Sequence, residues 1–159
     1  MTSPSSTEDP SPTRPEDPAS AALFDAVAGE HGIIYGYGLV SAHTTPDAND
    51  IVSFALAEHR ERREEAIARL AARDVAAPLP AAGYRLPIEI DGPADAAKLA
   101  VRMEEDSAVA WRAVLERAST NEDRAFAVTA LTESAVTAAK WREVVGMQPS
   151  TVAFPGGTE

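Results

Sequence analysis

The connection between residues 74 and 92, DVAAPLPAAGYRLPIEIDG, constrains the fold more than any other feature of the sequence. Its three prolines, Pro78, Pro80 and Pro87, forbid a long helix. Its 19 residues also exceed the roughly two to eight that usually join neighbouring helices. Extended, they span more than the roughly 37 Å of a 25-residue helix. The helices before and after this connection can therefore run parallel, joined by one long crossover.

Helical periodicity on the N-terminal side of the connection predicts two helices. The first is expected from residue 18 to about 43, with Asp17 as its N-cap and a proline at its first position. The second follows to about residue 73, because Thr44 with Asp47 three residues later has the spacing of a capping box. The two helices form one hairpin.

A second hairpin is predicted after the connection. A helix opens with a proline and covers residues 93 to about 119. Thr120 with Asp123 has capping-box spacing and starts the fourth helix, which runs to about residue 145. Gly146 is expected as its C-terminal stop. The expected fold is an all-α, up-down-down-up four-helix bundle.

Composition supports one helical domain with two tails. The 159 residues are 45% hydrophobic but only 6% aromatic, and the abundant alanine suits closely packed helices better than strands. We expect residues 19–146 to form the bundle and residues 1–18, rich in Pro, Ser, Thr and acids, to be disordered. Residues 147–159 are expected to form a C-terminal tail that Val152 and Phe154 anchor.

The charge balance argues against several classes of partner. A formal net charge of -11 repels nucleic acids and anionic membranes, and no basic patch offsets it. There is no cysteine, which excludes disulfides and thiolate chemistry. The N-terminus lacks the basic start and apolar stretch of a signal peptide, so a cytoplasmic location is expected.

The stretch GEHGIIYGYG, residues 29 to 38, places four glycines inside the first predicted helix. Each costs up to about 1 kcal/mol relative to alanine, so a compensating interaction is expected. Gly29, Gly32 and Gly36 share one face, where a neighbouring helix can approach closely. The neighbour is either another helix of the same chain or the same helix of a second subunit, which would make the protein a homodimer.

Polar residues interrupt the apolar seams of the first two helices. Glu30 and Tyr37 lie two turns apart on an otherwise apolar face, and His31 lies on the neighbouring seam. In the second helix His59 and Arg63 are one turn apart on the expected inner seam. The remaining charges of that helix are expected to form a solvated face: Glu61, Arg62, Glu64, Glu65 and Arg69.

Each helix also carries an acid on or beside its inner seam. Glu104 is the only charge on the seam of the third helix, and Glu133 lies on one side of the fourth. Glu58 and Glu30 complete the set on the first two helices. Acids projecting inward from four helices are the arrangement that metal-binding bundles use.

The chain resembles a bacterial family of ferritin-like domains whose function is unassigned. The resemblance covers nearly everything after about residue 20 and rests on the spacing of GEHGIIYGYG, AEHRERREEA, YRLPIEI, LTESAVTAAKWR and the terminal AFPG. The glutamate followed seven residues later by tyrosine, Glu30 and Tyr37, is similar to the ferritin pattern. The resemblance implies a ferritin-like fold and says little about activity.

The ligand set departs from a ferritin-like di-iron site. That site takes a Glu-x-x-His pair from each of two helices, but Glu58 is followed at this spacing by Glu61 and Glu133 by Val136. All three histidines of the chain lie in its first two predicted helices, so no symmetric site can be built.

The inner acids therefore have two possible roles. Arg63 can pair with Glu30 or Glu104 and complete a buried Glu/His/Arg/Tyr network without metal. We expect this network, no cofactor, and a non-catalytic bundle acting through contacts with a protein partner that the sequence does not identify. The alternative is a metal-binding protein or vestigial di-iron oxidoreductase that holds iron or another divalent metal. Its candidate ligands are Glu30, His59, Glu104, and Glu133 or His31.

Overall fold

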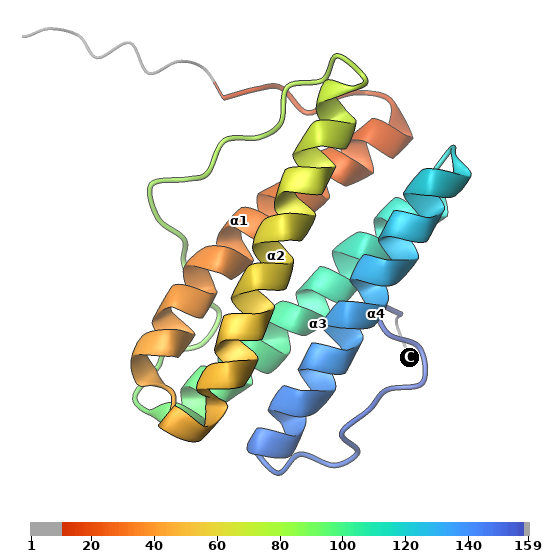
Figure 1. Ribbon diagram of the computed structural model, residues 1–159. Coiled ribbons are helices and arrows are strands. Elements are labelled where there is room, and N and C mark those ends of the chain that lie inside the picture. Colours follow the sequence, from red (N-terminus) through yellow and green to blue (C-terminus); the bar gives the residue numbers. More distant parts are fainter. Residues whose placement is uncertain (1–10, 158–159) are drawn as a thin grey trace, which may run out of the picture.

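A computed structural model describes residues 11–157 of the chain. Over this range it contains four α-helices, one 3-10 turn and no strand, which confirms the all-α prediction (Figure 1). None of the helices in this range combines the length and apolar character needed to cross a membrane. The elements are α1 (Pro18–His43), η1 (Pro46–Ala48), α2 (Asn49–Ala71), α3 (Pro93–Arg117) and α4 (Asn121–Val144).

The start of α1 agrees with its predicted cap. The Asp17 carboxylate accepts a 2.9 Å hydrogen bond from the Ser20 backbone N–H, and Pro18 is the first helical residue. Of the segment predicted to be a disordered tail, residues 1–10 lie outside the described range. Within residues 11–17, Arg14 forms two 2.7 Å hydrogen bonds to the Asp25 carboxylate on α1.

The predicted capping box at the start of the second helix is wrong. Thr44 ends α1, and its backbone N–H donates to the carbonyl of Val40. The 3-10 turn that begins at Pro46 comes next, and α2 starts after Ala48 without a side-chain cap bond. Because this proline fixes φ for a tight turn, regular α-helical geometry begins only after the turn.

The second hairpin begins and ends as its local sequence predicts. Pro93 is the first residue of α3. The Thr120 hydroxyl accepts a 3.1 Å hydrogen bond from the backbone N–H of Asp123 at the start of α4. Gly146 follows the helix with φ +70°, a left-handed conformation that favours glycine.

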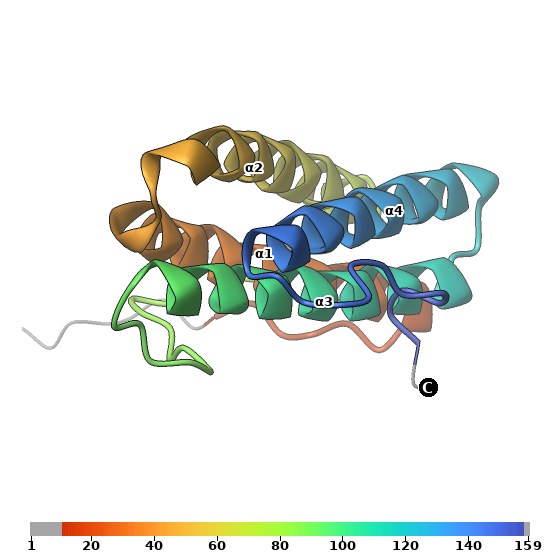
Figure 2. The same ribbon diagram turned by 90° about the horizontal axis from the view of Figure 1, so that it is seen from below.

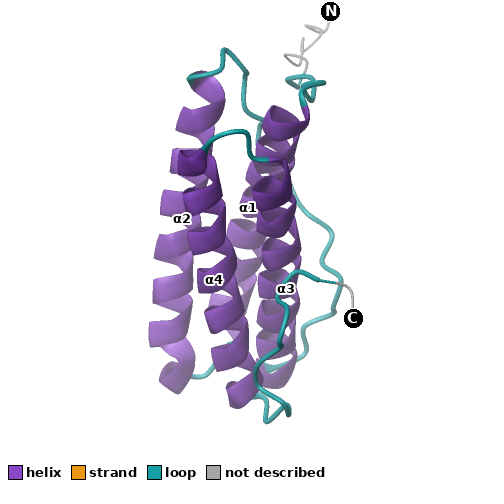
Figure 3. Ribbon diagram, turned by 90° about the vertical axis from the view of Figure 1, so that its right-hand side faces the viewer, coloured by secondary structure: helices purple, strands orange, loops and turns teal. Residues whose placement is uncertain are grey.

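The connection between α2 and α3 lies on the side of the bundle formed by α1 and α3 and follows its length (Figures 1 and 3). Tyr84 packs beside Tyr35 of α1, with ring centroids 5.4 Å apart. Leu86, Ile88 and Ile90 pack against the core. The connection is therefore held along its course by its own apolar side chains.

The helices form two layers, α1 with α3 and α2 with α4 (Figure 2). Between them lie two apolar clusters, one around Tyr37, Leu99 and Trp141 and the other around Leu70 and Trp111. Both tryptophans are fully buried. The polar side chains of the interior lie between the two clusters and constitute the candidate site.

Candidate functional site

His59 of α2 is the centre of the buried polar group. Its Nδ1 lies 2.6 Å from Glu30 Oε2, and its Nε2 lies 3.0 Å from Glu104 Oε1. All three side chains are about 1% exposed. Burial alone would lower the pKa of His59, but the charges and hydrogen bonds of the two glutamates raise it to about 9. An imidazolium that donates to both carboxylates therefore bridges α1 and α3.

Glu30 has a partner at each oxygen. Besides His59, the indole N–H of Trp111 donates to Oε1 at 2.8 Å, and the guanidinium of Arg62 lies 3.5 Å from the same oxygen. Burial would raise the pKa of Glu30, but the charge of His59, its hydrogen bond, Arg62 and the Trp111 bond together lower it. Glu30 is therefore a carboxylate at neutral pH.

Glu104 accepts hydrogen bonds from the described residues at one oxygen. The hydroxyl of Tyr37 donates to Oε1 at 2.5 Å, and the indole N–H of Trp141 donates to that hydroxyl at 2.9 Å. Burial and the adjacent carboxylate raise the pKa of Tyr37 well above its usual value, so the phenol keeps its proton. Within residues 11–157 no donor reaches Oε2 of Glu104, which is also buried.

The arginine of this network is Arg62, whereas the sequence pattern predicted Arg63. Arg62 is 5% exposed and donates to the Ser134 hydroxyl at 2.9 Å and to Glu133 at 3.0 Å. Arg63 instead pairs with its neighbour Glu64 near the surface. The buried positions of α2 step through Val52, Ala55, His59, Arg62, Ala66 and Leu70. These steps of three and four residues place Arg62, and not Arg63, on the buried face of α2.

The other predicted polar residues lie at the edge of the network or outside it. Glu133 is a partner of Arg62, although its side chain is 37% exposed. Burial and the nearby charge of Glu133 raise the pKa of Glu58, which makes no hydrogen bond to His59. His31 lies 3.1 Å from the carbonyl of Pro78 in the connection.

The three glycines of the predicted packing face have different neighbours. A Cβ atom at Gly36 would collide with the Met103 side chain of α3, so this position requires a close approach within the chain. A Cβ at Gly32 would lie 3.4 Å from the Tyr84 ring, and one at Gly29 would meet nothing within 4 Å. At Gly36 the closely packed neighbour is therefore a helix of the same chain. Packing of this face against a second subunit stays a prediction.

Several members of the network were not predicted. Ser107 of α3 and Ser134 of α4 are buried, and their hydroxyls lie 2.9 Å apart. Trp111 and Trp141 are fully buried in the apolar clusters, yet each donates its indole N–H into the network. One sequence signal could have indicated that Trp111 belongs to the network: it follows Glu104 by seven residues, which places it on the same seam two turns along the helix.

The donor set does not fit a di-iron centre. One imidazole lies between the two buried glutamates with both ring nitrogens on carboxylate oxygens, whereas each iron of such a centre requires its own histidine. Over residues 11–157 no group of three or more His, Asp or Glu side chains is placed to hold a metal ion. The positive charges that face these acids come from His59 and Arg62.

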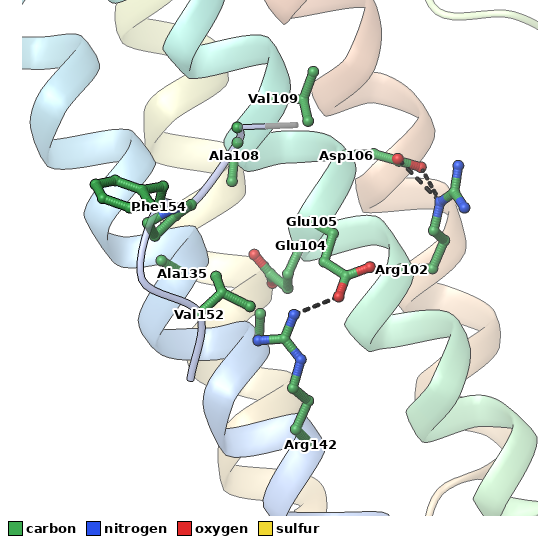
Figure 4. A pocket seen from close by; sticks show the side chains of 14 residues that line it. Arg102, Glu104, Glu105, Asp106, Ala108, Val109, Ala135, Arg142, Val152 and Phe154 are labelled. Carbon is green, nitrogen blue, oxygen red and sulfur yellow. Dashed lines mark hydrogen bonds and ion pairs between the residues drawn. The ribbon is translucent and has the colours of Figure 1, made fainter. Parts of the chain in front are cut away.

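A cavity of about 330 Å³ lies beside the network, between α3, α4 and the C-terminal segment, residues 147–157 (Figure 4). Glu104 and Arg142 are among its lining residues. The prediction that Val152 and Phe154 anchor this segment is wrong, because they are 43% and 68% exposed. Close backbone packing holds the segment instead, since a Cβ at Gly156 would lie 2.5 Å from a carbonyl oxygen of α3.

The chain belongs to a family described as a domain of unknown function, DUF4439, whose sequence profile matches residues 22–159. It is similar to the crystal structure of a conserved hypothetical protein, Rv2844, from Mycobacterium tuberculosis. The two share 58% sequence identity with a TM-score of 0.80, over 86% of this chain and 96% of that one. A search of curated proteins found no match. The predicted membership of a family without assigned function is confirmed.

Proposed function

We propose that this protein is a non-catalytic, ferritin-like bundle in which an internal ion network replaces a di-iron centre, and that it acts through protein contacts. The crossover of residues 72–92, which follows the length of the bundle in Figure 1, supports the up-down-down-up order of helices. Metal-centred catalysis would need accessible ligands, whereas the acids of this bundle are engaged with its own cations.

The single observation that carries the proposal is the placement of one imidazole between Glu30 and Glu104, at 2.6 and 3.0 Å. The imidazolium of His59 and the guanidinium of Arg62 supply two positive charges that balance the two buried carboxylates. A metal ion would have to displace the proton of His59 and compete with Arg62. The network therefore supports a role in holding the helices together and argues against metal binding.

The test is metal analysis of protein purified without an affinity tag, followed by titration with ferrous iron in air. We expect less than stoichiometric metal and no iron-dependent absorbance. The same measurements on a Glu104→Ala variant provide the comparison. Stoichiometric metal in the parent protein that this variant loses would overturn the proposal and establish the alternative, a metal-binding or vestigial oxidoreductase bundle.

Contacts with a second copy are the form of protein interaction that we propose. Val128 and Val136 on α4, and Phe54 on α2, are each close to half exposed and give this layer an apolar surface. Sedimentation velocity should give a dimer that Val136→Glu converts to a monomer, while Ala94→Glu at the exposed start of α3 leaves it intact. A monomeric parent protein would remove the homodimer from the proposal.

A further inference from the structure

The cavity between α3, α4 and the C-terminal segment has charged residues in its lining, but each of these three elements also gives it apolar side chains. Six of its lining residues are Ala108 and Val109 from α3, Ala135 and Ala138 from α4, and Val152 and Phe154 from the segment. Its volume of about 330 Å³ lies within the size range of sites for small organic molecules. Nothing in the ion network requires this space.

One polar atom of the cavity region has no partner. Glu104 lines the cavity, and Figure 4 shows its carboxylate on the side of α3 that faces α4. Its Oε1 accepts from Tyr37 and His59, which fix the position of the group. No donor among residues 11–157 reaches Oε2, although the residue is 1% exposed. A buried, fixed and unpaired acceptor is a place for a ligand N–H group.

The cations of the cavity are already paired. Arg142, itself 6% exposed, donates to Glu105 and to the backbone carbonyl of Ser150. At the rim Arg102 donates to Asp106 at 3.0 Å. The charge of Glu104 is shared with His59, so what the described part of the cavity leaves unused is an acceptor oxygen of this carboxylate, and the net charge of -11 on the chain also attracts a cation.

An organic cation fits these walls better than a metal ion. The described residues place no group of three or more ligands around Glu104, so a bare ion would lack coordination. A molecule that brings its own N–H donors and an apolar body satisfies both the carboxylate and the alanine and valine walls. The exposed ring of Phe154 can then cover the apolar end of that molecule.

We propose that this cavity binds a small organic ammonium ion, whose N–H group donates to Oε2 of Glu104 and whose apolar body packs between Val109 and Ala135. This ligand site goes beyond the proposed function and does not depend on it. The C-terminal segment forms one wall of the site, since its backbone at Gly156 packs directly on α3.

The test uses 2-phenylethylammonium as the probe and 2-phenylethanol and phenylacetate as matched neutral and anionic compounds. Binding is followed by the NMR signal of the Trp141 indole N–H, which is linked through Tyr37 to Glu104. We expect the ammonium probe to bind at least about tenfold more tightly than either control. Equal affinities, or no shift of this signal at about 10 mM probe, would overturn the proposal.

Two variants locate the binding. Glu104→Gln keeps the size of the side chain and should remove the preference for the ammonium probe. Ala135→Leu fills the cavity without altering the network and should abolish binding, whereas Ala125→Leu, on the exposed face of the same helix, should leave it unchanged. If Glu104→Gln does not fold, the comparison of Ala135→Leu with Ala125→Leu tests the site without it. Equal binding to the two leucine variants would refute this site, and metal analysis of the parent protein tests the proposed function separately.

Discussion

Glu30 and Glu104 are two equally buried carboxylates that meet the same histidine, yet their surroundings differ. Glu30 accepts hydrogen bonds at both oxygens, from His59 and Trp111, and lies near Arg62. Among the residues that the structure describes, Glu104 has hydrogen-bond donors only at Oε1. The first carboxylate is satisfied by the chain, while the second retains an unused oxygen beside a cavity.

This difference separates a structural role from a binding role. A buried charge with complete partners stabilises one arrangement of helices, and losing it leaves those partners uncompensated. A buried charge with an unused acceptor contributes less to stability and is available to a ligand. Stability and binding measurements on the two glutamates should therefore give opposite rankings.

The largest expected effect is that of Glu30→Gln. The substitution leaves His59 and Arg62 with insufficient negative charge in the core, and we expect a loss of about 3–5 kcal/mol in the free energy of unfolding. Glu104→Gln should cost about 1–2 kcal/mol, because one of its oxygens has no partner to lose. Urea denaturation at pH 7 measures both values. Equal losses would contradict the comparison.

The pH dependence of stability tests the bridge between the two carboxylates. The pKa of His59 rises from an ordinary 6.5 to about 9 on folding. Its contribution is therefore fully present below pH 6.5 and is lost as pH rises towards 9, by about 3 kcal/mol in total. Urea unfolding at pH values between 6.5 and 9 should show this decline in the free energy of unfolding. The control variant His43→Ala, which removes an exposed histidine, should show the same decline. A flat profile would show that the bridge is not ionised.

Arg62 and Arg63 form a matched pair of adjacent arginines. Arg62→Met removes hydrogen bonds to Glu133 and Ser134 in the buried network and should cost about 2 kcal/mol. Arg63→Met removes only a pairing with Glu64 near the surface and should change stability by less than about 0.5 kcal/mol. Thermal unfolding compares the two directly. The reverse ranking would support the register predicted from the sequence.

Several parts of the fold that depend on local chemistry were predictable from the sequence, although the capping box predicted at Thr44 is not formed. Asp17 and Thr120 cap their helices through backbone N–H groups only three residues away. Glu30 and Glu104 were recognised as inward acids because each interrupts an apolar seam. In each case the decisive information lies within two turns of one helix.

The remaining features depend on where other helices lie. Successive residues of a helix differ by about 100° in direction, so the choice between Arg62 and Arg63 is made by Glu133 and Ser134 on α4. The C-terminal segment is a similar case. Phe154 was expected to anchor it by hydrophobicity, but the contact is made by the backbone at Gly156. No local pattern encodes these tertiary contacts.

The smallest expected effects come from two glycines of α1, of which Gly36 controls how closely α3 approaches, and so where Glu104 lies relative to Glu30. Gly29→Ala adds a methyl group that meets nothing within 4 Å, and the gain in helix propensity should stabilise the protein by about 0.5–1 kcal/mol. Gly36→Ala gains the same propensity, but its methyl group collides with the Met103 side chain.

Because this methionine is flexible, part of the collision can be relieved by a change of rotamer, and the rest must push the two helices apart. We therefore expect Gly36→Ala to be about 1 kcal/mol less stable than Gly29→Ala in urea denaturation. The NMR titration of His59 provides a second measurement, since a wider α1–α3 separation weakens its bridge and lowers its pKa. If both variants are equally stabilised and this pKa is unchanged, the glycine does not set the spacing on which the bridge depends.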